Sequence, residues 1–255
     1  MPIRVVDDLK SAIALSGIFG ASAAATAPGI LPALPPEARE LPLPLPLFCA
    51  VLAAQLTVFY GLLAWAGIRL ARARGREPSS LLTRLWTTPS AGRGRERLVP
   101  AFGVGLCCGL LLVGAVTAIQ QLFPQTLPPT LHPPGIDVAL LASLAGSFGE
   151  EILFRLFLLS LLVRLLPSNR AGVAASVTVS ALAFGAAHAP AFVFLFGGWR
   201  EVPSMAWVWL IALNGICGVT YGIVFLRWGI LSAIAAHLGT DIVWHAASQS
   251  FGGVR

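Results

Sequence analysis

The chain has 255 residues, of which 56% are hydrophobic and only 11% are charged, whereas a typical soluble domain is about 25% charged. This composition excludes an ordinary soluble enzyme and indicates that a lipid bilayer is the natural solvent of the chain. The net charge of +6 would by itself be compatible with nucleic-acid binding. The positions of the basic residues are needed to distinguish nucleic-acid binding from an orientation signal in a membrane protein.

Seven stretches are apolar over the roughly 20 residues that a membrane-spanning helix needs. They are residues 11–31, 44–68, 99–122, 137–165, 171–198, 205–226 and 229–247. Little chain is left between them, so no separate soluble domain is expected. We predict an all-α, polytopic transmembrane helix bundle of about seven spans. Residues 1–136 hold the N-terminal helices and an Arg-rich loop at 69–98, and the last four spans, residues 137–247, form the core of the bundle.

The first span allows two interpretations. The Ala-rich stretch from Ser22 to Ala27 follows Lys10 and an apolar run, which also resembles a signal peptide with its cleavage region. The acidic residues Asp7 and Asp8 argue against that interpretation. Either outcome leaves the topology of the other spans unchanged.

The basic residues predict the orientation of the bundle. Eight arginines lie between the second and third spans: Arg69, Arg72, Arg74, Arg76, Arg84, Arg93, Arg95 and Arg97. If this loop is cytoplasmic, thirteen basic residues fall inside and three outside, as the positive-inside rule requires. We therefore expect a cytoplasmic N-terminus, an external C-terminus and no nucleic-acid partner. The Ala-, Leu-, Gly- and Arg-rich composition with a single lysine favours a bacterial plasma membrane.

Small residues within the spans are interpreted as packing residues. The four cysteines, Cys49, Cys107, Cys108 and Cys217, lack the spacing of a zinc knuckle or a disulfide framework. In the sixth span, Gly218 and Gly222 are four residues apart, a spacing that lets two membrane helices approach closely.

Within the fourth span, three charged residues fall in six positions: Glu150, Glu151 and Arg155. Charged side chains within a span are costly and by default indicate a functional site. Glu151 and Arg155 are four residues apart with the acid first, which favours an ion pair on one helix face. Glu150 is turned about 100° away on an α-helix. We therefore expect Glu150 to be the carboxylate that remains free for chemistry.

The fifth and seventh spans add two histidines and a further acid. His188 lies in the fifth span, and His237 and Asp241, four residues apart, share one face of the seventh. A rise of about 1.5 Å per residue places these side chains and Glu150 between roughly 12 and 26 Å from the cytoplasmic helix ends. A modest helix tilt would bring them to a common depth. A single histidine in a span is often only hydrogen-bonded to a neighbouring helix, but this combination favours a functional site.

The motifs Glu-Glu-x-x-x-Arg, Phe-x-x-x-His and His-x-x-x-Asp, in this order on successive helices, resemble those of the CAAX protease and bacteriocin-processing family of glutamate-dependent intramembrane peptidases. The resemblance covers residues 137–247. It implies that Glu150 and His188 position and deprotonate the attacking water, that Glu151 and Arg155 support that helix, and that His237 and the residue four positions later stabilise the oxyanion.

The sequence departs from the family at one position. Many members of the family have Asn where this chain has Asp241, and an ionised carboxylate has no proton to donate. Asp241 is therefore expected either to be protonated or to orient His237. The resemblance implies a membrane-associated protein or peptide substrate. It does not choose between prenylated carboxyl-terminal motifs and other peptides, although the bacterial composition disfavours the prenyl-protein role.

Other mechanisms find less support in the sequence. There is no His-Glu-x-x-His zinc motif, no Gly-x-Ser in a span with a partnering histidine and no transmembrane Asp pair. Two histidines and a glutamate can nevertheless bind zinc. We expect a metal-free water mechanism without a cofactor, with zinc as the alternative. A transporter that binds an ion or proton at the same residues, or an inactive membrane scaffold, is the alternative function, but we find none of the internal repeats typical of transporters.

Overall fold

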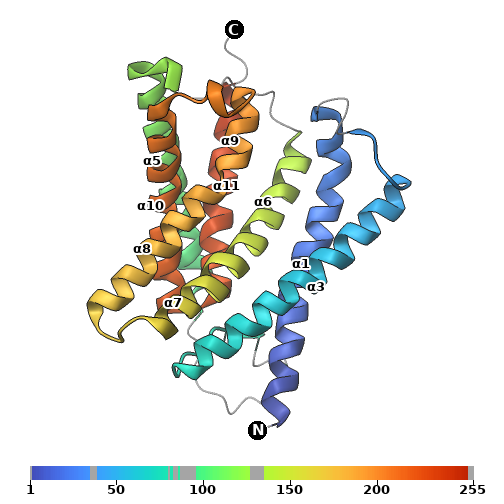
Figure 1. Ribbon diagram of the computed structural model, residues 1–255, viewed down its shortest axis with the longest axis vertical. Coiled ribbons are helices and arrows are strands. Elements are labelled where there is room, and N and C mark those ends of the chain that lie inside the picture. Colours follow the sequence, from blue (N-terminus) through green and yellow to red (C-terminus); the bar gives the residue numbers. More distant parts are fainter. Residues whose placement is uncertain are drawn as a thin grey trace.

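The computed structural model describes residues 2–34, 39–79, 81, 82, 86, 96–126 and 135–251, and these residues form a helical bundle without a β-strand (Figure 1). This confirms the all-α prediction. The helices are α1 (Pro2–Ile30), α3 (Leu45–Ala73), α5 (Leu98–Leu122), α6 (Ile136–Glu150), α7 (Ser160–Leu165), α8 (Arg170–Ala187), α9 (Ala189–Phe196), α10 (Ser204–Trp228) and α11 (Ile230–Phe251). A π-helix, η3 (Glu151–Leu159), joins α6 to α7, and three short 3₁₀ turns are η1 (Leu31–Ala33), η2 (Pro124–Thr126) and η4 (Trp199–Glu201).

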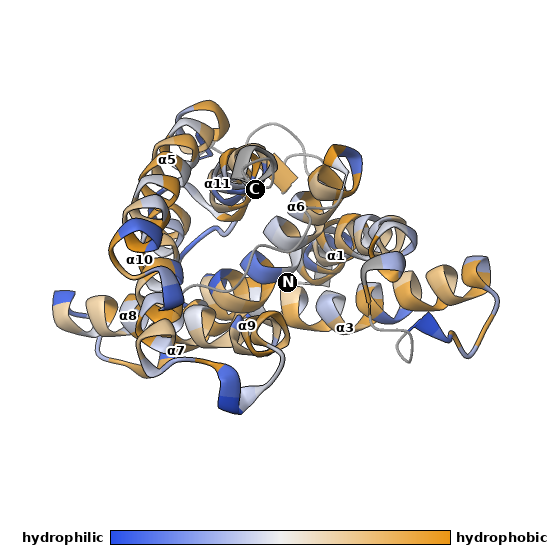
Figure 2. Cartoon of the chain, turned by 90° about the horizontal axis from the view of Figure 1, so that it is seen from above, coloured by the Kyte–Doolittle hydropathy of each residue, from blue (hydrophilic) through white to orange (hydrophobic). Residues whose placement is uncertain are grey.

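Within these described ranges, six helical segments are long and apolar enough to cross a membrane: Val5–Ile30, Leu45–Ala73, Leu98–Leu122, Arg170–Phe196, Ser204–Trp228 and Ile230–Ala247. The predicted span 137–165 is also helical throughout, but it is divided into α6, η3 and α7. Large apolar side chains are exposed on several of these helices, and Leu111 of α5, for example, is 76% exposed. Figure 2 shows that hydrophobic residues make up much of the long helices. Such a surface fits a bilayer rather than water.

Three predicted boundaries need correction. Helix α1 begins at Pro2 rather than near residue 11. Helix α3 continues to Ala73, so Arg69 and Arg72 lie on the helix and not in the predicted loop at 69–98. The predicted span 171–198 is interrupted at His188, where α8 ends and α9 begins. Residues 80, 83–85 and 87–95 of the Arg-rich loop lie outside the described residues.

The buried acid Asp8 of α1 is explained by ion pairs with α3. Asp8 is 1% exposed and forms ion pairs with Arg72 and, at 3.9 Å, with Arg69. Arg72 also lies 3.0 Å from Glu77. A buried carboxylate needs such a partner, and the pairing ties α1 to α3 at the end of the bundle where the N-terminus lies (Figure 1).

The centre of the bundle is η3, which contacts α3, α8, α10 and α11. Its apolar residues Ile152, Leu156 and Leu159 are fully buried. These side chains anchor the segment that follows Glu150, so the charged residues of this region are held by the hydrophobic core rather than by a surface loop.

Close helix contacts at glycines place the functional helices. A Cβ atom on Gly218 would lie 2.9 Å from Cα of Ala181, and one on Gly222 would lie 3.3 Å from a methyl group of Val177. Both glycines therefore pack α10 on α8, which confirms the prediction. A second contact, unforeseen, joins α11 to α5: a Cβ atom on Gly239 would lie 2.6 Å from the carbonyl oxygen of Phe102.

Candidate active site

Glu151 and Arg155 form a buried ion pair within η3. Nη1 of Arg155 lies 3.1 Å from Oε1 of Glu151, and both side chains are at most 1% exposed. The predicted pairing is therefore confirmed, although the backbone is π-helical rather than α-helical there. π-Helical segments are rare and occur frequently at functional sites.

The guanidinium group of Arg155 connects η3 to two neighbouring helices. Its Nη2 atom donates a hydrogen bond to the carbonyl oxygen of Gly218 on α10, at 3.3 Å. The group also lies 4.3 Å from the ring centre of Phe184 and 5.1 Å from that of Tyr221. Aromatic faces stabilise a cation at such distances, so the charge is compensated by a carboxylate on one side and by rings on the others.

His237 of α11 is held from two directions. Its Nδ1 atom lies 2.9 Å from Oε1 of Glu151 and donates a hydrogen bond to that carboxylate. Its ring stacks on Tyr221 with the centroids 4.6 Å apart and an angle of 17° between the planes. The hydrogen bond and the stack fix both the direction of Nδ1 and the plane of the ring, so Nε2 has a defined direction as well.

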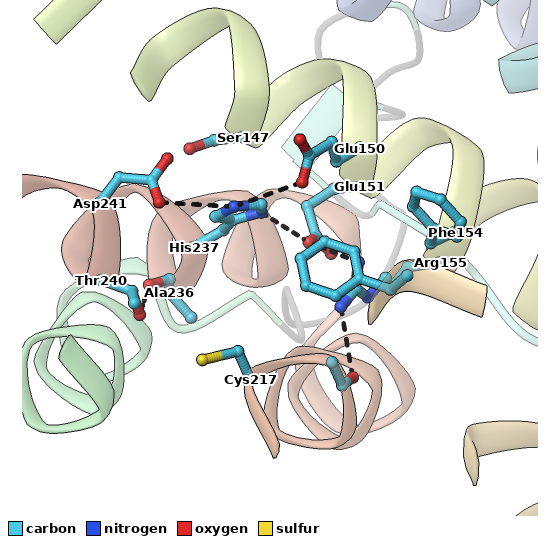
Figure 3. A network of polar contacts seen from close by, with 12 residues as sticks. Ser147, Glu150, Glu151, Phe154, Arg155, Cys217, Ala236, His237, Thr240 and Asp241 are labelled. Atoms are coloured by element: carbon cyan, nitrogen blue, oxygen red, sulfur yellow. Dashed lines mark hydrogen bonds and ion pairs between the residues drawn. The ribbon is translucent and has the colours of Figure 1, made fainter. Parts of the chain in front are cut away.

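Two carboxylates surround the Nε2 side of His237, as Figure 3 shows. Oε2 of Glu150 lies 3.8 Å from Nε2, and Oδ1 of Asp241 lies 3.6 Å from it. Both distances exceed a direct hydrogen bond. Neither acid therefore makes a direct hydrogen bond to this imidazole nitrogen.

His188 lies at the break between α8 and α9. Its Nδ1 atom donates a hydrogen bond to the carbonyl oxygen of Phe184, at 2.9 Å, which leaves Nε2 directed toward Glu150, 3.9 Å from Oε2. The Phe-x-x-x-His motif thus has a physical basis, since the Phe184 backbone orients His188 while its ring contacts Arg155.

Glu150 makes no direct hydrogen bond to a described residue through Oε2. This atom is buried, yet the side chain as a whole is 35% exposed. A Cβ atom on Gly146, one turn earlier in α6, would lie 3.8 Å from Oδ2 of Asp241 and 4.0 Å from Oε1 of Glu150. Because Gly146 carries no side chain, the space between the two acids stays open.

The structure brings all six predicted residues together: Glu150, Glu151, Arg155, His188, His237 and Asp241. Sequence reasoning missed the contact between Glu151 and His237, and it missed Tyr221 entirely. The motif Phe-x-x-x-His was the available signal for Phe184. For Tyr221, a residue of α10, no local pattern pointed to the site.

The donor atoms of Glu150, His188 and His237 are of the types that zinc accepts. In the part of the chain that the structure describes, however, no group of three or more His, Cys, Asp or Glu side chains is arranged to hold a metal ion.

Comparison with known families gives a match for the part of the chain that carries the site. Residues 133–243 match the model of the family described as type II CAAX prenyl endopeptidase Rce1-like. Neither the curated proteins nor the solved structures give a significant match. The matched residues include every member of the network described above. The family match confirms the resemblance drawn from the three motifs, because residues 133–243, which carry the site, are similar to this family.

Proposed function

We propose that the protein is an intramembrane endopeptidase that hydrolyses a peptide bond of a membrane-associated protein or peptide with a water molecule activated by Glu150 and His188. Two findings support the general class. The matched family is one of endopeptidases, and six described helical segments are suited to cross a membrane. Hydrolysis within a membrane requires a base and a bound water among apolar helices, and we propose that Glu150 and the histidines beside it provide this site.

The observation that carries the proposal is the position of Oε2 of Glu150. It lies 3.9 Å from Nε2 of His188 and 3.8 Å from Nε2 of His237. Polar atoms separated by more than about 3.5 Å are often bridged by water. A water bound among these three atoms would be within reach of a carboxylate base, with its proton accepted by Glu150 and its orientation fixed by Nε2 of His188.

His237 and Asp241 are proposed to stabilise the oxyanion that forms when this water attacks the peptide carbonyl. Because Nδ1 of His237 donates to Glu151, Nε2 is the atom that faces the reacting group. A proton shared between Nε2 and the Asp241 carboxyl, 3.6 Å away, would supply a donor at this point. Glu151 and Arg155 are proposed to hold the imidazole in place rather than to contact the substrate.

The proposed orientation follows from the basic residues, with a cytoplasmic N-terminus and an external C-terminus. Reporter fusions at each end, one active only in the cytoplasm and one only outside, test it directly. A cytoplasmic C-terminus would contradict the orientation without affecting the chemistry.

The function is tested with purified protein reconstituted in liposomes together with membrane proteins from the native host. New peptide termini, identified by mass spectrometry, should appear with wild-type protein and not with Glu150→Gln. The inactive variant should also retain the substrate for identification. If no terminus depends on Glu150 while the liposomes conduct ions or protons, the alternative of a transporter is correct.

A further inference from the structure

Two thiols that the proposed chemistry does not use meet between α5 and α10. Sγ of Cys108 lies 3.4 Å from Sγ of Cys217, and the two residues are 8% and 5% exposed. A disulfide has an S–S bond of about 2.05 Å, so the sulfurs would need to approach by about 1.4 Å. Side-chain rotation with a slight helix shift can provide this approach.

A groove between the same two helices leads to both sulfur atoms. It has a volume of about 640 Å³, and its walls consist mainly of apolar residues such as Leu111, Leu112 and Leu213. Cys108 and Cys217 form part of the wall. Because α5 and α10 are both suited to cross a membrane, a small apolar molecule dissolved in the bilayer could enter this groove and reach the thiols.

The thiol pair lies between the two sides of the candidate active site. Three residues before Cys108, the carbonyl oxygen of Gly105 accepts a hydrogen bond from Oγ1 of Thr240 on α11, at 3.0 Å. Directly after Cys217, the carbonyl oxygen of Gly218 accepts the hydrogen bond from Arg155. A covalent bond between the two cysteines would therefore join the helix that supports α11 to the helix that supports Arg155.

We propose that Cys108 and Cys217 form an oxidisable dithiol, a modification site that reacts with a small apolar disulfide in the α5–α10 groove. One thiol attacks the reagent, loses its proton, forms a mixed disulfide and releases one thiol. The second cysteine attacks the first sulfur, which forms the Cys108–Cys217 bond and releases the other thiol. The protein loses two hydrogens and two electrons, and the reagent gains both.

The chain provides its own controls for this reaction. Cys107 lines the same groove and is exposed, and Cys49 is partly exposed on α3. Each should react with the reagent and keep the mixed disulfide, because no second thiol contacts either sulfur among the described residues. The replacement Cys49→Ser/Cys107→Ser removes these reactions and leaves the pair intact.

The experiment treats this double variant, folded in detergent, with dithiodipyridine. Absorbance counts the released pyridinethione, and intact-protein mass spectrometry measures the product. We expect two pyridinethiones per chain, no retained pyridyl group and a Cys108–Cys217 peptide that disappears on reduction. A further Cys217→Ser replacement should leave one pyridyl group on Cys108. The readout does not depend on peptidase activity, so it stands or fails separately from the proposed function.

Two results would overturn the inference. Retention of two pyridyl groups by the double variant would show that the thiols react separately and do not join. Absence of pyridinethione release, while Cys107 of the wild-type protein reacts, would show that the groove does not give access to the pair.

Discussion

Oε1 of Glu151 lies 2.9 Å from Nδ1 of His237, and this hydrogen bond joins η3 to α11 across the centre of the bundle. The same oxygen atom lies 3.1 Å from Nη1 of Arg155. A carboxylate that accepts from an imidazole fixes the tautomer and orientation of the ring, as in other catalytic sites where an acid supports a histidine. In the proposed mechanism, Glu151 therefore acts through His237, and Glu150 is the carboxylate that faces the water.

Glu150→Gln should abolish cleavage while the protein remains folded. The replacement removes the base but keeps the shape and most hydrogen-bonding capacity, and loss of a general base typically costs about 10²- to 10⁴-fold in rate. Cleavage of a trapped substrate in liposomes and thermal unfolding in detergent measure the two effects. Glu201→Gln, at an exposed position in η4, is the matched control. Wild-type turnover by Glu150→Gln would contradict the mechanism.

Glu151→Gln and Arg155→Leu should each lower the folded yield as well as the activity. Each leaves its fully buried partner without a counter-charge, which typically costs about 3 to 5 kcal/mol of folding free energy. The thermal unfolding midpoint in detergent is the measurement, and Arg164→Leu, on the exposed side of α7, should leave it unchanged. If both variants fold normally but are inactive, the pair takes part in the reaction directly.

Activity should survive exhaustive chelation, and Asp241→Asn should keep substantial activity. With Glu151 paired to Arg155, two further carboxylates, Glu150 and Asp241, face His237. Both cannot remain charged cheaply in a low dielectric. We propose that a shared proton removes one of these two negative charges. The side-chain amide of Asn would donate a hydrogen bond at the same position. If the active enzyme contains stoichiometric zinc, and if activity is lost when zinc is removed and restored when zinc is returned, a metal ion rather than a proton balances the charge.

Tyr221→Phe should keep most of the activity, whereas Tyr221→Leu should lower the turnover number more than it changes KM. Phenylalanine retains the ring that stacks on His237 and faces Arg155, while leucine removes both contacts. Steady-state kinetics of the two variants separate these cases. Equal loss of activity in both would show that the hydroxyl group, rather than the ring, is required.

Gly239→Ala should destabilise the protein and displace His237 and Asp241 together, because its Cβ atom would lie 2.6 Å from the carbonyl oxygen of Phe102. Overpacking of this kind typically costs about 1 to 3 kcal/mol. Gly103→Ala is the control, since no atom lies within 4 Å of its Cβ position. Replacement of a helical glycine by alanine where there is open space should be neutral or stabilising. A similar unfolding midpoint for both variants would show that α5 can move away from α11 at little cost.

Contacts within one helix could be predicted from the sequence, and contacts between distant helices could not. The ion pair of Glu151 with Arg155 follows from their spacing. The break at His188 also had a signal, because Pro190 lies in the first turn of α9 and proline is favoured there. By contrast, the shared face of His237 and Asp241 favoured a direct contact between them, yet Nε2 of His237 lies 3.6 Å from Oδ1 of Asp241, and Nδ1 of His237 bonds to Glu151 instead. That choice depends on how η3 packs against α11, which no local spacing encodes.

The π-helical geometry of η3 has a consequence for changes in chain length. A π-helix bonds each N–H to the carbonyl five residues earlier, whereas an α-helix uses the fourth, so η3 holds more residues per turn than the α-helices on either side. Removal of a single residue between Glu151 and Leu159 could therefore be absorbed by a return to α-helical bonding, without a gap in the backbone. The same deletion would rotate α6 relative to α7 and carry Glu150 away from both histidines. A shortened chain of this kind would remain helical and inserted but would lose the geometry around Oε2 of Glu150.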